Sequence, residues 1–169
     1  MSFRIAPARP QDAGIVVDLV RQLAEYEKLA HLVVATEEMV RAELFGPRPV
    51  IEAVIGWEDA GDGQGEAATA VGFALYFHNF STFLARRGLY LEDLFVIPAA
   101  RGRGYGKALI THLARLAVER GCGRFEWSVL DWNAPAIAFY RALGAEVLPD
   151  WRICRLTGDA LDRLGATAA

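Results

Sequence analysis

Residues 89–107 constrain the fold more than any other stretch of this chain. Strand-forming side chains fill residues 89–97, and Pro98 ends that run. The next segment holds alternate glycines flanked by basic residues: Arg101, Gly102, Arg103, Gly104, Gly106 and Lys107. Apolar side chains then recur with helical spacing over residues 109–117. A strand that leads through glycines into a helix is typical of an anion site, because the helix N-terminus offers unpaired N–H groups and glycine lets a phosphate approach the backbone.

The spacing of the glycines narrows the choice of anion. It does not match G-x-x-x-x-G-K-[ST], the loop that holds nucleoside triphosphates, and it is one residue too tight for the dinucleotide pattern G-x-G-x-x-G. The pattern from Arg101 to Gly106 is Arg-x-x-Gly-x-Gly. It resembles the pyrophosphate loop of the GCN5-related N-acetyltransferases (the GNAT family), which bind acetyl-coenzyme A. A plain glycine turn with basic residues for solubility is the alternative.

Composition indicates one globular domain over residues 1–169. The chain is 53% hydrophobic and 23% charged, and its apolar runs are shorter than the roughly 20 residues of a membrane span. The N-terminus shows no secretory pattern, and Cys122 and Cys154 lack metal-site spacing, so a cytoplasmic protein without a metal is expected. The net charge of −3 argues against nucleic acid and is compatible with a cationic substrate.

The order of predicted elements is β-α-α-β-β-β-α-β-α-β, which gives an α/β fold with a mixed sheet and helices on both faces. Strands are expected at residues 2–5, 50–57, 68–77, 89–97, 124–130 and 151–156. Helices are expected from an N-cap at Asp12 to about residue 28, from a cap at Thr36 to residue 45, from the glycine loop to Gly121, and at residues 136–143. Residues 58–66 are expected to form the long, mobile tip of an antiparallel hairpin, and residues 165–169 a frayed tail.

The acidic pair Glu92-Asp93 interrupts an otherwise apolar strand. Strand side chains alternate between faces, so one carboxylate is expected on each face of the sheet. A buried unpaired charge is costly, so at least one acid is expected to open into a cavity. Ion pairing with Arg86, Arg87 or Arg124 is the alternative.

Two further acids, Glu25 and Glu27, lie at the predicted C-terminal end of the first helix. Acidic side chains are electrostatically unfavourable there, which makes a functional role and a solvated face equally open readings. His78 is interpreted as a surface or hydrogen-bonded histidine rather than a base.

A second segment supports the family resemblance: Asn133-Ala-Pro-Ala-Ile-Ala-Phe-Tyr140, followed by Gly144. Within the GNAT family the chain is most similar to the diamine (spermidine/spermine) and thialysine N-acetyltransferases. The shared pieces run in order along the chain: Leu23-Ala-x-Tyr26-Glu27, Val71-Gly-Phe-Ala, Leu89-Tyr-Leu-Glu-Asp-x-Phe-Val96, the glycine loop, Trp132-Asn-x-Pro135, Phe139-Tyr140, Gly144-Ala145 and Trp151-Arg152. The resemblance implies a mostly antiparallel central sheet and a homodimer.

The resemblance implies a site for acetyl-coenzyme A. A bulge would separate the central strand from its neighbour to admit the pantetheine arm, and a backbone N–H near Phe95 would polarise the thioester carbonyl. The implied coenzyme-binding residues are Leu94, Phe95, Val96, Arg101, Gly102, Arg103, Gly104, Tyr105, Gly106, Lys107, Asn133, Ala134, Pro135 and Ala136. Asn133 is also a candidate helix N-cap, and the two roles are compatible.

The resemblance implies acetyl transfer to a primary amine by direct attack. Glu92 would hold the ammonium and accept its proton through water, Tyr140 would protonate the leaving thiolate, and Tyr26, Glu27, Asp93 and Trp151 would line the amine site. On spacing alone, Tyr140 reads as a core or interface tyrosine. Residues 28–31 and the segment before Trp151 carry fewer acids than polyamine-acetylating relatives do, which argues against a long polycation. An enzyme for protein N-termini or another small amine, and a coenzyme-binding module without turnover, are the alternative functions.

Overall fold

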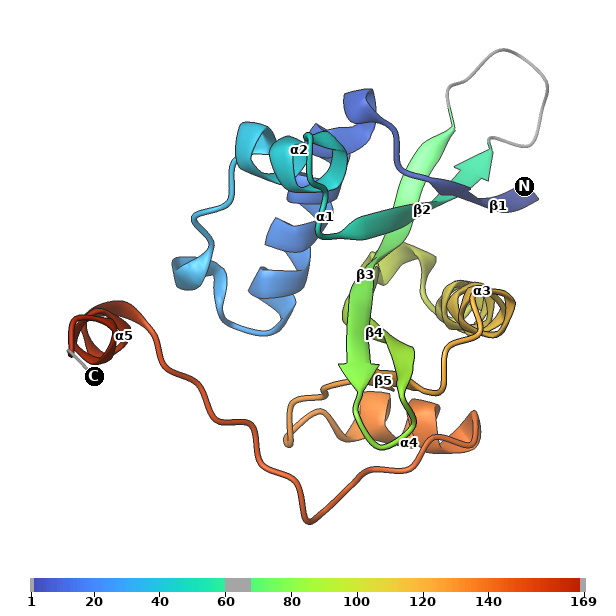
Figure 1. Ribbon diagram of the computed structural model, residues 1–169. Coiled ribbons are helices and arrows are strands. Elements are labelled where there is room, and N and C mark those ends of the chain that lie inside the picture. The colour runs from blue at the N-terminus through green and yellow to red at the C-terminus, as the bar shows by residue number, and fades with distance from the viewer. Residues whose placement is uncertain (1, 60–67, 168–169) are drawn as a thin grey trace. The chain divides into compact units, whose positions relative to one another are not determined.

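The computed structural model describes residues 2–59 and 68–167, which form two compact units divided between Ser128 and Val129 (Figure 1). The prediction of a single domain over residues 1–169 stays a prediction. The first unit contains β1 (Ser2–Pro7), α1 (Ala13–Tyr26), α2 (Glu37–Phe45), β2 (Glu52–Asp59), β3 (Thr69–Ser81), β4 (Arg86–Val96), α3 (Tyr105–Glu119) and β5 (Phe125–Trp127). The second contains α4 (Ala134–Ala142) and α5 (Gly158–Gly165). Short 3₁₀ turns are η1 (Pro10–Asp12), η2 (Ala30–Leu32) and η3 (Pro98–Ala100).

The sheet of the first unit has the strand order β1-β2-β3-β4-β5. The first four strands pair antiparallel with their neighbours, and β5 pairs parallel with β4. Helices α1 and α2 cover one face and α3 covers the other (Figure 1). The predicted mixed, mostly antiparallel sheet with helices on both faces is therefore confirmed.

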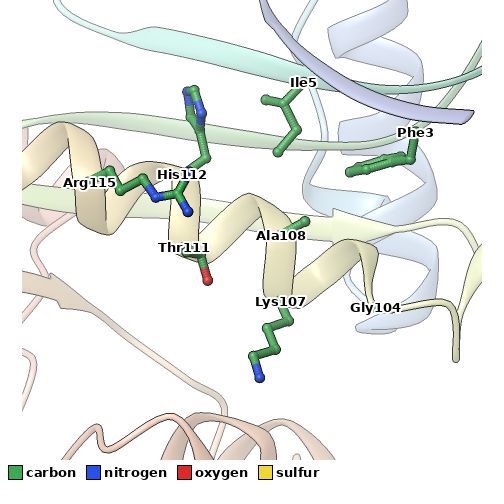
Figure 2. Close-up of a pocket in the computed structure, with 8 residues that line it drawn as sticks. All are labelled: Phe3, Ile5, Gly104, Lys107, Ala108, Thr111, His112 and Arg115. Carbon is green, nitrogen blue, oxygen red and sulfur yellow. The ribbon is translucent and has the colours of Figure 1, made fainter.

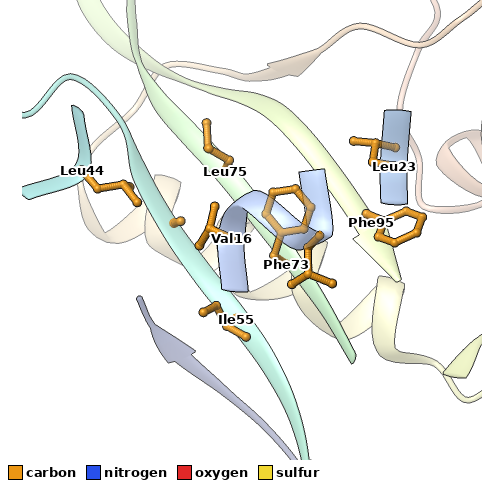
Figure 3. Close-up of a cluster of buried hydrophobic side chains, with 9 residues drawn as sticks. Val16, Leu23, Leu44, Ile55, Phe73, Leu75 and Phe95 are labelled. Carbon is orange, nitrogen blue, oxygen red and sulfur yellow. The ribbon is translucent and has the colours of Figure 1, made fainter. Parts of the chain in front are cut away.

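Two apolar clusters hold the helices to the sheet. The cluster under α1 and α2 joins Val16 and Leu23 of α1 to Phe73 of β3 and Phe95 of β4 (Figure 3). The cluster under α3 joins the buried helix residues Leu109, Leu113 and Ala117 to strand residues that include Leu89 and Leu91. Both helices place apolar side chains at the i, i+3/i+4 spacing that the sequence predicts, and that stripe is what they bury.

Helix ends follow local chemistry in most places. Thr36 caps α2 as predicted, since its Oγ1 accepts a hydrogen bond from Met39 N at 3.2 Å. Asp12 precedes α1 as predicted, but its carboxylate accepts hydrogen bonds from Arg9 N and Nε at 2.9 and 3.0 Å instead of capping α1. Gly121, with φ of 66°, follows the last turn of α3 at the predicted end.

The β2–β3 hairpin is antiparallel as predicted. Of its predicted mobile tip at residues 58–66, residues 58 and 59 belong instead to β2, and residues 60–66 lie outside the described residues. Strand β3 extends beyond the predicted end at residue 77 to Ser81. A turn follows, in which Ala85 has φ of 48°.

The predicted strand at residues 151–156 is wrong. These residues form no helix or strand, and Trp151 and Ile153 are 75% and 71% exposed. An alternating apolar pattern becomes a strand only beside another strand, and the second unit, as far as it is described, contains helices alone. The strand predicted at residues 124–130 is also shorter, only Phe125–Trp127.

Helix α5 was missed by the sequence reading. Its signals are weak but present: Asp159 in the first turn, Arg163 in the last, and Leu161 and Leu164 three residues apart. The predicted tail begins at Gly165, the last residue of this helix, and residues 168 and 169 lie outside the described part.

Two phenylalanines with opposite burial are expected to contribute very differently to the free energy of unfolding. Phe73 is fully buried, whereas Phe83 in the β3–β4 turn is 96% exposed. We expect Phe73→Ala to lower the free energy of unfolding by about 3–5 kcal/mol, because it removes buried surface and leaves a cavity. Phe83→Ala should change it by less than about 0.5 kcal/mol. Urea unfolding followed by circular dichroism measures both, and equal effects would contradict this assignment of the core.

Candidate active site

A bulge in β4 creates the centre of the site. Leu75 of β3 lies opposite Asp93, but the next residue, Tyr76, lies opposite Leu91, so Glu92 is an extra residue with no partner of its own. Leu91 and Leu94 both pack into the cluster under α3 although they are three residues apart. The alternation of side chains therefore shifts phase at the bulge.

This phase shift corrects the placement of the two acids. Instead of pointing to opposite faces, Glu92 and Asp93 lie between two residues that share the α3 face, and Phe95 beyond them packs on the α1 face. Glu92 is exposed and Asp93 is half-buried. Burial, with the negative charges of Glu92 and then Glu27, raises the pKa of Asp93 to about 6.

Glu27 reaches the same region from the end of α1. It is half-buried, and burial raises the pKa of its carboxyl above the ordinary value, whereas Glu25 is exposed. The sequence left open whether these acids have a functional role or belong to a solvated face, and the structure separates them. Glu25 belongs to a solvated face, and Glu27 lies close enough to Asp93 to perturb it.

The alternative of an ion pair for Glu92 or Asp93 is wrong within residues 2–59 and 68–167. Neither acid forms a salt bridge with Arg86, Arg87 or Arg124 there, and Arg124 Nε instead lies 2.7 Å from Glu126 Oε2. The carboxylates are therefore positioned to attract a cation that does not come from those arginines.

The bulge also opens one edge of β4. Pairing with β5 covers only Leu89–Leu91 of β4. Past the bulge, Ile97 N donates to Val71 O at 3.0 Å, and two-residue alternation then directs the main-chain groups of Phe95 toward β3 and those of Leu94 and Val96 toward the open side. Val96 O accepts from Arg101 Nε at 3.0 Å, so the groups that an extended ligand can reach along this edge are the main-chain groups of Leu94 and the N–H of Val96.

The glycine loop has the conformation that an anion cradle requires. Gly102 and Gly104 have φ of 76° and 83°, in the left-handed region, and a Cβ at either would meet nothing within 4 Å. The first hydrogen bond of α3 runs from Ala108 N to Gly104 O. The N–H groups of residues 105–107 therefore precede the helix's own ladder and point out of its N-terminus.

A hollow of about 560 Å³ lies beside this helix N-terminus and contains no acidic side chain in its lining. Its lining residues are Phe3, Ile5, Gly104, Lys107, Ala108, Thr111, His112 and Arg115. Figure 2 shows Lys107 extending away from Phe3 and Ile5. The glycine loop and the open N-terminus of α3 suit an anionic group such as a phosphate.

Arg103, predicted to add charge to the anion site, is held by an acid that the sequence did not single out. Arg103 Nη1 and Tyr105 Oη both donate to Glu58 Oε1 at 2.6 Å, and these bonds, that from Tyr105 foremost, hold the pKa of Glu58 below its ordinary value. Tyr105 also stacks on Phe3 with ring centroids 4.0 Å apart. Glu58 is the penultimate residue of β2 and the first residue of the predicted hairpin tip, where nothing in the sequence distinguishes it from its acidic neighbours.

Arg101 lies between the loop and the acids. Its Nε donates to Val96 O at 3.0 Å, and its guanidinium lies 4.5 Å from the ring centroid of Tyr26 and 5.6 Å from that of Phe95. The structure thus brings together Tyr26, Glu27, Glu92, Asp93 and the loop.

The remaining predicted site residues belong to the second unit. Asn133 is buried and caps α4, since its Oδ1 accepts from Ala136 N at 3.3 Å, with Ala134 and Pro135 in the first turn. Tyr140 lies in the last turn of α4, and Trp151 lies in the exposed segment after it. Their roles in coenzyme binding, catalysis and amine binding stay predictions.

His78 has a structural role, in agreement with the interpretation from sequence. Arg120 Nη1 donates to His78 Nε2 at 2.9 Å, which leaves Nδ1 to donate to Gly88 O, also at 2.9 Å. Arg120 is in turn held by both carboxylate oxygens of Glu52. Both ring nitrogens are therefore engaged in fixing β3 to β4 and α3.

The described residues form neither a metal-binding group nor a membrane-spanning helix. Outside residues 1, 60–67 and 168–169, no group of three His, Cys, Asp or Glu side chains is placed to hold a metal ion. Among the same residues, none of the helices has the length and apolar character needed to span a bilayer.

Comparison with known proteins identifies the fold and the chemistry. The model of the acetyltransferase (GNAT) family matches residues 18–145. Thialysine N-epsilon-acetyltransferase of Mus musculus is 38% identical over 166 residues, covering 96% of this chain and 97% of the relative. L-ornithine N5-acetyltransferase of Arabidopsis thaliana is 37% identical over 203 residues, covering 97% and 88%. The solved structure of an integron cassette protein from V. cholerae superposes with a TM-score of 0.78 at 25% identity, covering 99% of both chains.

These matches agree with the site. The family model includes the bulged strand, the glycine loop and α4, and both curated relatives extend over nearly the whole chain. The chain belongs to the GNAT family and is an N-acetyltransferase.

Proposed function

We propose that this enzyme transfers the acetyl group of acetyl-coenzyme A to a primary amine of a small molecule, a diamine, polyamine or lysine-like amino acid. The observation that carries the proposal is the group of acids at the bulge, with Asp93 half-buried and its pKa raised between Glu92 and Glu27. Such a group attracts an ammonium and lowers the energy of the protonated amine near the coenzyme edge.

The curated relatives support an amine carried by an amino acid. One is named for the Nε of thialysine and the other for the N5 of L-ornithine, both side-chain amines. The segment after Glu27, Lys28-Leu-Ala-His31, offers a cation where a polyamine site would need further acids. Electrostatics therefore favours a substrate with one terminal ammonium over a long polycation.

The acids have separate tasks in this proposal. An amine with a pKa near ~10 is protonated at neutral pH and cannot attack a carbonyl until it loses a proton. Exposed Glu92 receives the ammonium and accepts its proton through water, while half-buried Asp93 and Glu27 hold the cation in place, with Tyr26 lining the site. A role of Trp151 in amine binding stays the prediction made from the sequence.

The bulged strand and the loop hold the coenzyme, whose thioester supplies the acetyl group. The outward main-chain groups of Leu94 and the N–H of Val96 bind the pantetheine arm, and one N–H of this segment polarises the carbonyl. The N–H groups at the start of α3, with Gly102 and Gly104, receive the pyrophosphate, and the side chains of Arg101, Arg103 and Lys107 add positive charge. Asn133, Ala134, Pro135 and Ala136 bind the arm from the start of α4.

Tyr140 completes the reaction as general acid. The amine nitrogen forms a bond with the acetyl carbon while the carbon–sulfur bond breaks, and Tyr140 gives its phenol proton to the departing sulfur. A phenol has a pKa of about 10, close to that of a thiol, so this transfer is nearly balanced in free energy. The homodimer and the cytoplasmic location expected from the sequence stay predictions.

The first experiment is coenzyme A release from acetyl-coenzyme A across an amine panel: putrescine, spermidine, spermine, lysine, ornithine, thialysine and a short peptide. We expect turnover on the amino-acid amines, and Glu92→Gln should reduce kcat/KM for the best amine about 10²-fold because the proton acceptor is lost. Acetyl-coenzyme A binding, measured by calorimetry, should be unchanged in this variant. Binding without turnover on any amine would favour a coenzyme-binding module, and turnover on the peptide alone an enzyme for protein N-termini.

Asp93 gives a prediction about stability and pH. Its pKa is raised from 3.8 to about 6 in the folded protein, so folding favours the protonated form, and this contribution is present below pH 4 and lost as pH rises through 6. Asp93→Asn should therefore raise the free energy of unfolding by about 1–3 kcal/mol at pH 8 and by less at pH 4. Urea unfolding at both values tests this. Glu25→Gln, at an exposed acid that does not perturb Asp93, is the control, with little change expected, and an unaltered pH dependence in Asp93→Asn would refute the assignment.

Tyr140 gives a prediction about the chemical step. Tyr140→Phe should lower kcat about 10²-fold or more, because the thiolate must then leave without the proton donor. The KM for acetyl-coenzyme A should stay within about twofold, since the ring is retained. Tyr90→Phe, which removes a phenol that bonds Ser128 Oγ at 2.8 Å, is the control expected to keep normal turnover. Normal kcat in Tyr140→Phe would remove the general-acid role.

A further inference from the structure

Arg101 joins three elements that belong to different parts of the proposed reaction. It follows η3 and opens the glycine loop, where its N–H donates to Pro98 O at 3.2 Å. Its Nε donates to Val96 O on the open edge of β4, and its guanidinium carbon lies over the ring of Tyr26 at the end of α1, 4.5 Å from the ring centroid. Arg101 thus contacts the glycine loop, the edge of β4 and the Tyr26 side of the proposed amine site.

The chemistry of the guanidinium allows all of these contacts at once. The flat face of the group stacks on an aromatic ring, while its N–H groups donate within the plane to acceptors at the edge. The ring of Tyr26 on one side and Val96 O as acceptor together restrict how the Arg101 guanidinium is placed and where its other N–H groups can meet an anion in the loop. A lysine at this position would keep the charge but lose the defined plane.

Backbone hydrogen bonds at the end of α1 fix the segment that carries the Tyr26 ring, which Arg101 contacts. Lys28 N donates to Glu25 O at 3.1 Å and Leu29 N donates to Ala24 O at 2.7 Å, a helix termination in which Lys28 takes φ of 62°. This left-handed conformation is unfavourable for a residue with a Cβ. These backbone contacts fix the short segment that contains Tyr26 and Glu27. A displacement of the Tyr26 ring is therefore expected to shift Glu27 as well.

We propose that Arg101 is a positioning residue that couples occupation of the glycine loop to the placement of Tyr26 and Glu27 in the amine site. The inference rests on the proposed function for the identity of the two ligands, but the coupling itself is a property of Arg101. An anion in the loop orients the guanidinium, and the guanidinium orients the wall that receives the amine. Coupling of this kind is reciprocal, so a change at Tyr26 must alter affinity for the coenzyme.

The test is a double-mutant cycle on coenzyme A affinity, measured by calorimetry. Tyr26→Leu removes the stacking surface and should weaken coenzyme A binding about threefold to tenfold, while Tyr26→Phe keeps the ring and should bind within about twofold. In an Arg101→Lys background, the same Tyr26→Leu change should have an effect below about twofold. Equal effects in both backgrounds would overturn the proposal, because the two residues would then act independently.

Arg103→Lys is the matched control background. Arg103 lies in the same loop and carries the same charge, but it is held by Glu58 and not by Tyr26. Tyr26→Leu should therefore keep its full effect on coenzyme A affinity in this background. Loss of the effect in Arg103→Lys as well would mean that any perturbation of the loop suffices, and Arg101 would lose its assigned role. Circular dichroism and thermal unfolding check that every variant is folded.

Steady-state kinetics with the amine and with acetyl-coenzyme A distinguish failure of this inference from failure of the proposed function. If the amine reaction is established, Arg101→Lys should raise KM for the amine about fivefold as well as KM for acetyl-coenzyme A, and Tyr26→Leu should add little to the amine KM in that background. A residue that only bound pyrophosphate would change the coenzyme KM alone, which would refute the coupling. If no amine turns over, the proposed function fails, while the binding cycle still decides the role of Arg101.

Discussion

The extra residue at Glu92 is the constraint on which the rest of the site depends. One unpaired residue in β4 shifts the phase of side-chain alternation, which puts Asp93 on the side of Glu27 and returns Leu94 to the α3 core. The same irregularity coincides with the end of pairing to β5, so the edge past the bulge keeps its hydrogen-bonding groups available. A single local defect thus provides both the acid group and the open strand edge.

The rigid surroundings make this defect tolerable. The bulge lies between two apolar clusters, one built on α1 and one on α3, and Gly72 lets β3 approach so closely that an added Cβ would lie 2.6 Å from Phe95 O. The loop on the coenzyme side is anchored in the same way, through Glu58, Tyr105 and Phe3. Preorganised groups of this kind need little rearrangement when charge develops in a reaction.

Elements set by local chemistry were predicted correctly from sequence. The helical periodicity of α1 and α3, the cap at Thr36, the glycine loop between β4 and α3 and the N-cap at Asn133 all depend on neighbours within a few residues. The predictions that were wrong concern features that depend on residues far apart in the sequence. The alternation rule placed Glu92 and Asp93 on opposite faces because the bulge is defined only against β3, and residues 151–156 have a strand pattern with no strand to pair with in their own unit. The contact of Arg101 with Tyr26 and the bond of Glu58 with Tyr105 likewise join positions far apart in the chain, which no single-sequence pattern reports.

The open edge of β4 has a consequence for the behaviour of the protein in solution. Outward-facing main-chain groups at Leu94 and Val96 are a template for any passing strand, and an exposed edge of this kind promotes aggregation between copies. In most sheets a charged side chain or a covering loop blocks such an edge. Under the proposed function this stretch stays accessible for the arm of the coenzyme, and Glu92 at its start is the one acidic residue of the bulge that faces solvent. A charge at the start of an open edge disfavours pairing with a second copy of the chain, so Glu92 also protects this edge against self-association.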